Sequence, residues 1–344
     1  MASGAPAYKV EDRSLLLPFY RRFFVEPVLP YLPLSLHPNS ITHAGHALNL
    51  GGVAILLLLW PTRGWPFVLA ALLLQLYLWC DNADGAHARR TGQCSPFGEF
   101  LDHGLDMLNT AYIALFTAMA LGASPLAWVT LAAIIPGAGV AAYWEQAQTG
   151  VFRLGLLNQV ESILVLCLAL MTSAILGTEL FDRVVLLGVP LGLAMTIWTV
   201  STILFGVARG IVRVVTKDGP TTAVPALGPL LFWAAVTSAA ALGVIPTVAA
   251  VTIAVGGNVT LGMRMLSSRL LGRKPRLEPT TALGALVLFA LCTLRLTGHA
   301  VDPRVAGPAL ATLACATFGI QALLDARDGV QELARGPQGG VALK

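Results

Sequence analysis

The chain has 344 residues, of which 56% are apolar and only 12% charged, and its mean hydropathy is +0.73. This composition excludes a water-soluble globular protein, because the polar side chains are too few to cover a core of this size. The formal net charge of +4 could indicate an anionic partner, but the positions of the charges carry more information than their sum. We expect no nucleic acid to bind.

The first element is a segment over residues 14–36 that mixes bulky apolar side chains with Arg21, Arg22 and Glu26. Its four prolines exclude one long helix. We expect residues 1–38 to form a cytoplasmic N-terminal segment that lies along the membrane surface as an amphipathic stretch. A gate for a lipid substrate is the alternative interpretation.

The remainder of the chain predicts an all-α, polytopic integral membrane protein. A membrane-spanning helix needs about 20 mostly apolar residues, and about ten stretches meet this requirement. They lie near residues 41–60, 66–88, 97–122, 124–147, 155–176, 188–210, 223–243, 246–266, 280–297 and 305–325. We therefore expect a membrane domain over residues 39–326 and a cytoplasmic tail over residues 327–344.

The basic residues predict the orientation of these spans. With ten spans and a cytoplasmic N-terminus, the segments outside the cell or organelle carry only Arg63, Arg183 and Arg304, with Arg295 near the outer end of a span. All other Lys and Arg residues fall on the cytoplasmic side, as the positive-inside rule requires. Both termini are therefore expected to be cytoplasmic.

Small residues within the spans predict close packing of helices. The pairs Gly206 with Gly210 and Gly256 with Gly257 are most simply explained by close approach of neighbouring helices. The five cysteines are scattered and form no C-x-x-C pair, so we interpret them as small apolar residues.

Four aspartates stand out in the stretch from Cys80 to Asp106, inside or at the ends of two otherwise apolar spans. An ionised carboxylate at membrane depth costs a few kcal/mol. On helices, Asp81 and Asp84 share one face, and Asp102 and Asp106 share another. Facing each other, these pairs would form an all-oxygen site suited to Mg²⁺ or Mn²⁺.

The residues around the aspartates add features of a phosphate site. Gly85 and Ala88 would let a nucleotide or pyrophosphate approach the helix closely. The guanidinium group of Arg89 can donate paired hydrogen bonds to phosphate. On the next span Glu99, Asp102, His103 and Asp106 form one polar stripe that should face the carboxylates of the second span.

Helix packing, a zinc site and a transporter each fit this cluster less well. The acids could pair with arginines or help helices associate, but that role does not need four aspartates in ordered spacing beside Glu, His and Arg. A zinc site is disfavoured because no second His or Cys lies at ligand spacing from His103. A non-catalytic transporter could use carboxylates to couple ions, but it has no need of Gly85, Ala88 and Arg89 beside them.

The pattern Asp81-x-x-Asp84-Gly85-x-x-Ala88-Arg89, eight residues, Gly98-x-x-x-Asp102-x-x-x-Asp106 resembles the CDP-alcohol phosphotransferase signature at every fixed position. The stretch from Ser95 to Asp106, with Glu99 and His103, is similar to the choline and ethanolamine phosphotransferase branch of that family. So is the stretch from Pro38 to Thr42, followed by Gly45 and Asn49. A weaker resemblance runs from Trp144 to Glu161.

The resemblance implies a role for each matching residue. Asp81, Asp84, Glu99, Asp102 and Asp106 would hold two ions of Mg²⁺ or Mn²⁺. The substrate-binding set would be Asn39, Gly85, Ala88, Arg89 and Gly98, with Asn39 and Arg89 contacting the nucleotide. His103 would be the catalytic base, since an imidazole accepts a proton near neutral pH more readily than a carboxylate that coordinates metal ions. Asp106 remains the alternative base.

The implied reaction moves phosphocholine or phosphoethanolamine from CDP-choline or CDP-ethanolamine to diacylglycerol and releases CMP. The resemblance also implies a site on the cytoplasmic side and a homodimer among membrane lipids. Ala86 and His87 replace a Lys-Gln pair typical of eukaryotic members, so the headgroup stays open. A transferase that uses CDP-diacylglycerol as donor and a polar alcohol as acceptor is the alternative enzyme.

Overall fold

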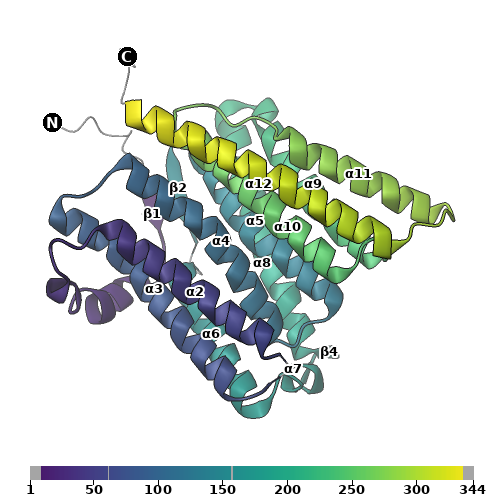
Figure 1. Cartoon of the computed structure of the whole chain (residues 1–344), viewed down its shortest axis with the longest axis horizontal. Helices are drawn as coiled ribbons and strands as arrows, with labels where there is room; N and C mark the ends of the chain where they lie inside the picture. The colour runs from purple at the N-terminus through teal and green to yellow at the C-terminus, as the bar shows by residue number, and fades with distance from the viewer. Residues whose placement is uncertain (1–8, 61, 156–157, 336–344) are drawn as a thin grey trace.

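The structure is a computed structural model that describes residues 9–60, 62–155 and 158–335. It is dominated by ten long helices (Figure 1). Their bounds are α2 (Pro38–Leu58), α3 (Trp65–Thr91), α4 (Pro96–Ala120), α5 (Pro125–Thr149), α6 (Gln159–Leu176), α8 (Leu191–Asp218), α9 (Val224–Ala241), α10 (Thr247–Leu270), α11 (Pro279–Leu296) and α12 (Pro303–Arg335). Each predicted span coincides with one of them.

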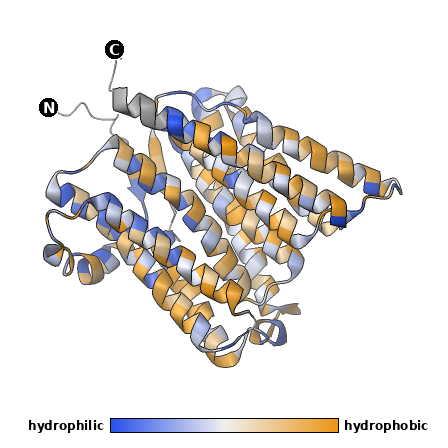
Figure 2. Cartoon of the chain, in the orientation of Figure 1, coloured by the Kyte–Doolittle hydropathy of each residue, from blue (hydrophilic) through white to orange (hydrophobic). Residues whose placement is uncertain are grey.

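Nine of the helices in the described ranges are long and apolar enough to cross a membrane, which confirms a polytopic membrane protein. The exception is α4, because three acidic side chains in its first half and Asn109 just after them lower its hydropathy. It nevertheless contacts α2, α5, α6, α10 and α12. Figure 2 shows hydrophobic residues running along the long helices.

The shorter elements lie in the connections and before α2. They are β1 (Lys9–Asp12), α1 (Leu17–Tyr20), a π-helical turn (Arg21–Val25), a 3-10 turn (Leu29–Tyr31), β2 (Val151–Leu154), α7 (Leu180–Arg183), β3 (Val185–Leu186), β4 (Val189–Pro190) and a second 3-10 turn (Pro220–Ala223). The prolines thus break the N-terminal segment into short turns, as expected. The four short strands form two pairs, β1 with β2 in parallel and β3 with β4 antiparallel.

Two apolar cores flank α4. One is built mainly from α2, α3, α4 and α6, with Leu74, Phe116 and Leu170 fully buried in it. The other joins α4 and α5 to α9, α10, α11 and α12 around Phe232 and Leu266. Figure 1 shows α4 between the α2–α3 pair and the α10–α12 pair, so the helix with the acidic stripe lies at the junction of both halves.

Local sequence signals set the ends of the helices that carry the acids. Ser95 accepts a hydrogen bond from Gly98 N through its Oγ at 3.0 Å, so it caps α4 directly before Pro96 at the first helical position. At the other end of the α3–α4 connection Gly92 ends α3 with φ +69°, a left-handed conformation that glycine adopts without strain.

The N-terminal segment is tied to the bundle by side chains of α3 and α6. Arg90 donates to the carbonyl oxygens of Leu29, Pro30 and Leu32. Glu161 is one of the residues in the weaker resemblance. Its carboxylate accepts hydrogen bonds from Ser14 Oγ at 2.6 Å and from the backbone N–H groups of Leu15 and Leu16. It also completes the capping box of α6, so it anchors this segment and is not part of the aspartate cluster.

The glycines of α10 confirm the packing interpretation for one predicted pair. A Cβ built on Gly257 would lie 2.2 Å from the ring of Phe232 on α9, and one on Gly256 would lie 3.1 Å from the ring of Phe318 on α12. Gly210 lies against Glu145, whereas no described residue lies within 4 Å of a Cβ built on Gly206. Close packing therefore explains three of the four glycines, and the prediction is wrong for Gly206.

We expect Gly257→Ala to destabilise the protein by roughly 1–3 kcal/mol, because the added methyl group overpacks the fully buried ring of Phe232. The measurement is the thermal unfolding midpoint of the purified chain in detergent. The matched control is Gly284→Ala on α11, where none of the described residues lies within 4 Å of the new Cβ. An equal midpoint in both variants would contradict the packing argument.

The last helix extends past the end of the last predicted span. α12 continues to Arg335, so the segment expected over residues 327–344 begins inside this helix, and its last part, residues 336–344, lies outside the described residues. The five cysteines are all unpaired, in agreement with their interpretation as small apolar residues.

Candidate metal and substrate site

Three of the four predicted aspartates meet between α3 and α4. Asp81 on α3 and Asp102 and Asp106 on α4 each offer a carboxylate oxygen, and these oxygens lie within 4.8 Å of one another. Three like charges at this spacing repel each other strongly in a partly buried site. A hard divalent cation, which prefers oxygen ligands, would relieve the repulsion, so the residues present fit a site for a divalent cation.

Asp84 is the fourth aspartate, and it lies outside this group of three. It is 4% exposed. Its Oδ2 accepts from Thr42 Oγ1 of α2 at 2.6 Å, and its Oδ1 accepts from Gly85 N at 2.5 Å. These bonds fix the carboxylate one helical turn from Asp81. Thr42 belongs to the stretch from Pro38 to Thr42 that resembles the family, but no role was predicted for it.

A polar layer continues from the aspartates toward the other end of α2. Asn109 follows Asp106 by three residues on α4, so the two share a face. Its Oδ1 accepts from Asn49 Nδ2 at 3.1 Å and lies 3.3 Å from His46 Nδ1. Asn49 and Asn109 are buried. This network was not predicted, although amide side chains inside apolar spans are a signal that could have indicated it.

Glu99 and His103 contact α10, α5 and β2, so the predicted stripe does not face α3 along its whole width. Glu99 forms an ion pair with Arg269 of α10. The ring of His103 lies 5.6 Å from that of Tyr143 on α5 and 6.2 Å from that of Phe152 on β2, centroid to centroid. The stripe therefore divides, with Asp102 and Asp106 facing α3 and its other edge facing α5, β2 and α10.

The Nδ1 atom of His103 is buried and has no hydrogen-bond partner among the described residues. A buried polar atom without a partner costs free energy, so its presence beside an acidic site calls for an explanation. Holding or accepting a proton is one such role, because a neutral imidazole carries one nitrogen that accepts. The stacked rings of Tyr143 and Phe152 fix the plane of the imidazole.

The residues predicted to contact substrate lie at the starts of α2 and α4 and near the end of α3. A Cβ built on Gly98 would lie 3.3 Å from Asn39 Oδ1, so the starts of α2 and α4 adjoin. Gly85 and Ala88 are partly exposed at i+4 and i+7 from Asp81, on the same face of α3. Arg89 is exposed, and its Nη1 would lie 3.4 Å from a Cβ on Gly85. A phosphate at this surface would meet small residues and a cation.

Comparisons with known proteins agree with this geometry. The family model described as CDP-alcohol phosphatidyltransferase matches residues 35–198, a range that contains all the residues of the aspartate cluster. Cholinephosphotransferase 1 of Mus musculus is 32% identical over 190 residues, which are 52% of this chain and 47% of that protein. Choline/ethanolaminephosphotransferase 1 of Saccharomyces cerevisiae is 30% identical over 193 residues, 54% of this chain and 49% of that protein.

The chain thus spans about half the length of these relatives. It covers more of cholinephosphotransferase 1 of Gallus gallus, to which it is 32% identical over 242 residues, 63% of this chain and 68% of that protein. The family model matches the part of the chain that holds the aspartates. From this similarity and the signature between Asp81 and Asp106, the chain belongs to the CDP-alcohol phosphatidyltransferase family.

Proposed function

We propose that the protein transfers phosphocholine or phosphoethanolamine from a CDP-alcohol to diacylglycerol and releases CMP. The observation that carries this proposal is the convergence of Asp81, Asp102 and Asp106 between two helices of a membrane protein. The relatives named cholinephosphotransferase and choline/ethanolaminephosphotransferase support the choice of donor and acceptor. Transfer inside a bilayer also suits an acceptor that is itself a lipid.

In this proposal the divalent cations are held by Asp81, Asp84, Glu99, Asp102 and Asp106, of which Glu99 is also paired with Arg269. The cations, Mg²⁺ or Mn²⁺, would supply charge stabilisation for the pyrophosphate oxygens of the donor. Asn39 and Arg89 contact the nucleotide, and Gly85, Ala88 and Gly98 leave room for it. Thr42 positions Asp84 through the hydrogen bond described above.

The proton chemistry is assigned to His103. In the proposed step the diacylglycerol hydroxyl attacks the β-phosphorus of the donor in line, the oxygen of CMP leaves with the bonding electron pair, and Nδ1 of His103 takes the hydroxyl proton. The Nδ1 atom has no hydrogen-bond partner among the described residues, which supports this role. Asp106 is the other candidate base, since it lies on the same helix one turn away.

The basic residues near the site suggest on which side of the membrane it lies. The ends of α3 and α10 nearest to it carry Arg89, Arg90 and Arg269, so by the positive-inside rule we place this end of the bundle, and with it both termini, on the cytoplasmic side. A water-soluble donor then enters from the cytoplasm and a lipid acceptor from the side. A homodimer is part of the proposal as well.

The experiment is transfer by the purified protein in lipid or detergent with Mg²⁺ or Mn²⁺. One arm supplies CDP-choline or CDP-ethanolamine with diacylglycerol, and the other supplies CDP-diacylglycerol with a panel of polar alcohols. Product in the first arm is the expected result. Product only in the second arm would keep the metal site and overturn both substrates, whereas no product in either arm would refute the enzymatic function.

A further inference from the structure

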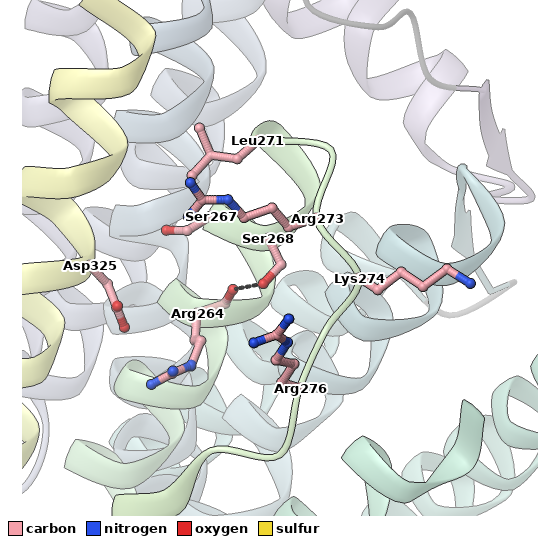
Figure 3. A pocket seen from close by; sticks show the side chains of 8 residues that line it. All are labelled: Arg264, Ser267, Ser268, Leu271, Arg273, Lys274, Arg276 and Asp325. Atoms are coloured by element: carbon pink, nitrogen blue, oxygen red, sulfur yellow. Dashed lines mark hydrogen bonds between the residues drawn. The ribbon is translucent and has the colours of Figure 1, made fainter. Parts of the chain in front are cut away.

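A second polar site lies at the end of α10, where the chain turns toward α11. It is a cavity of about 560 Å³ lined by side chains of α10, of the α10–α11 connection and of α12. Figure 3 shows Arg264, Ser267, Arg273, Arg276 and Asp325 around it, with Lys274 extending away from the others. None of the residues that line this cavity belongs to the aspartate cluster.

The lining of the cavity is suited to an anion. Arg264 is paired with the buried carboxylate of Glu278 at 3.4 Å. Counted by residue type alone, the lining has four basic side chains, Arg264, Arg273, Lys274 and Arg276, and one acidic side chain, Asp325. Basic residues therefore outnumber acidic residues in the lining. Guanidinium groups bind phosphate through paired hydrogen bonds, so a phosphate ester is the chemical class that this lining favours.

Ser267 provides an independent indication of a ligand. Its hydroxyl oxygen is buried and has no hydrogen-bond partner among the described residues. The neighbouring Ser268, in contrast, donates to the carbonyl oxygen of Arg264 at 2.8 Å, as hydroxyl groups in helices commonly do. The Ser267 hydroxyl is thus available to donate to an oxygen atom bound in the cavity that it lines.

The position of the cavity indicates that the phosphate belongs to a lipid. The cavity lies beside the connection between two candidate spans, the level at which lipid headgroups meet a membrane protein. The adjoining helices expose large apolar side chains, among them Leu286 of α11 and Leu323 of α12, which are 66% and 72% exposed. Acyl chains could lie along these faces while the headgroup occupies the cavity.

We propose that this cavity binds the phosphate group of an anionic phospholipid, at a site separate from the aspartate cluster. The proposal goes beyond the transfer reaction, because a lipid bound there is neither donor nor acceptor. Its test measures binding and needs no turnover, so its failure would leave the proposed function untouched.

The test uses the full chain purified in detergent and follows the thermal unfolding midpoint as short-chain phosphatidylglycerol or, separately, short-chain phosphatidylcholine is added. A ligand that binds the folded state raises the midpoint in a concentration-dependent way. We expect phosphatidylglycerol to give a rise that phosphatidylcholine does not. Arg276→Gln should weaken the apparent affinity about tenfold, which corresponds to about 1.4 kcal/mol. Ser267→Ala, which changes no charge, should weaken it less.

The control for charge is Arg209→Gln, which removes an exposed arginine of α8 that does not line the cavity. The apparent affinity of this variant for phosphatidylglycerol should equal that of the parent. Equal affinity in Arg276→Gln and the parent, or an equal loss in Arg209→Gln, would overturn the site. Inorganic phosphate is the third probe. A rise with inorganic phosphate as large as that with phosphatidylglycerol would support the phosphate site and assign free phosphate as its source.

Discussion

Asp81→Asn is expected to abolish transfer activity while leaving the metal-free protein as stable as the parent or more stable. Its carboxylate lies within 4.8 Å of those of Asp102 and Asp106, so removing one charge relieves repulsion when no cation is bound. The same change removes a ligand of the cations. Metal ions contribute several kcal/mol to the transition state, and about 1.4 kcal/mol is a factor of ten in rate, so activity should fall about a thousandfold or more.

The measurement combines initial rates with thermal unfolding midpoints, each with and without Mg²⁺ or Mn²⁺. The parent should be stabilised by the cation, and Asp81→Asn should lose that stabilisation. The matched control is Asp218→Asn at the exposed end of α8, which should keep both activity and the metal response. Retention of the metal-dependent rise in Asp81→Asn would exclude this residue from the metal site.

His103→Phe is expected to lower the turnover number by a factor of about 10²–10⁴, the usual contribution of a general base. Phenylalanine keeps an aromatic ring beside Tyr143 and Phe152 but has no nitrogen to accept a proton. Because no carboxylate changes, the stabilisation by Mg²⁺ or Mn²⁺ should persist. This combination separates a proton-transfer role from a structural one.

The measurement is the rate at saturating donor and acceptor, with the unfolding midpoint as a check on folding. His299→Ala, in the exposed connection before α12, is the control and should retain full activity. If His103→Phe loses less than about tenfold while Asp106→Asn keeps its metal response and loses far more, Asp106 is the base and the assignment of His103 is wrong.

Sequence-based reasoning worked best where the signal is local. Each long apolar stretch became a helix, because twenty or so apolar residues in a bilayer must satisfy their own backbone hydrogen bonds. Ser95 with Pro96, and Gly92, set helix ends through capping that also involves only nearby residues, although these caps were not predicted. The spacing of the aspartates likewise fixed which of them share a helix face, since the period of a helix is the same in any surroundings.

The sequence by itself thus determined the membrane class, the helices and the two faces that carry the acids. Only the tertiary structure decided which acids meet: Asp81 joins Asp102 and Asp106, Asp84 is held by Thr42, and Glu99 turns to Arg269 on α10, 170 residues further along the chain. The physical reason is that the rotation of each helix about its axis, and hence its partners, is set by packing against helices that are distant in sequence. Spacing along one helix carries no information about that packing.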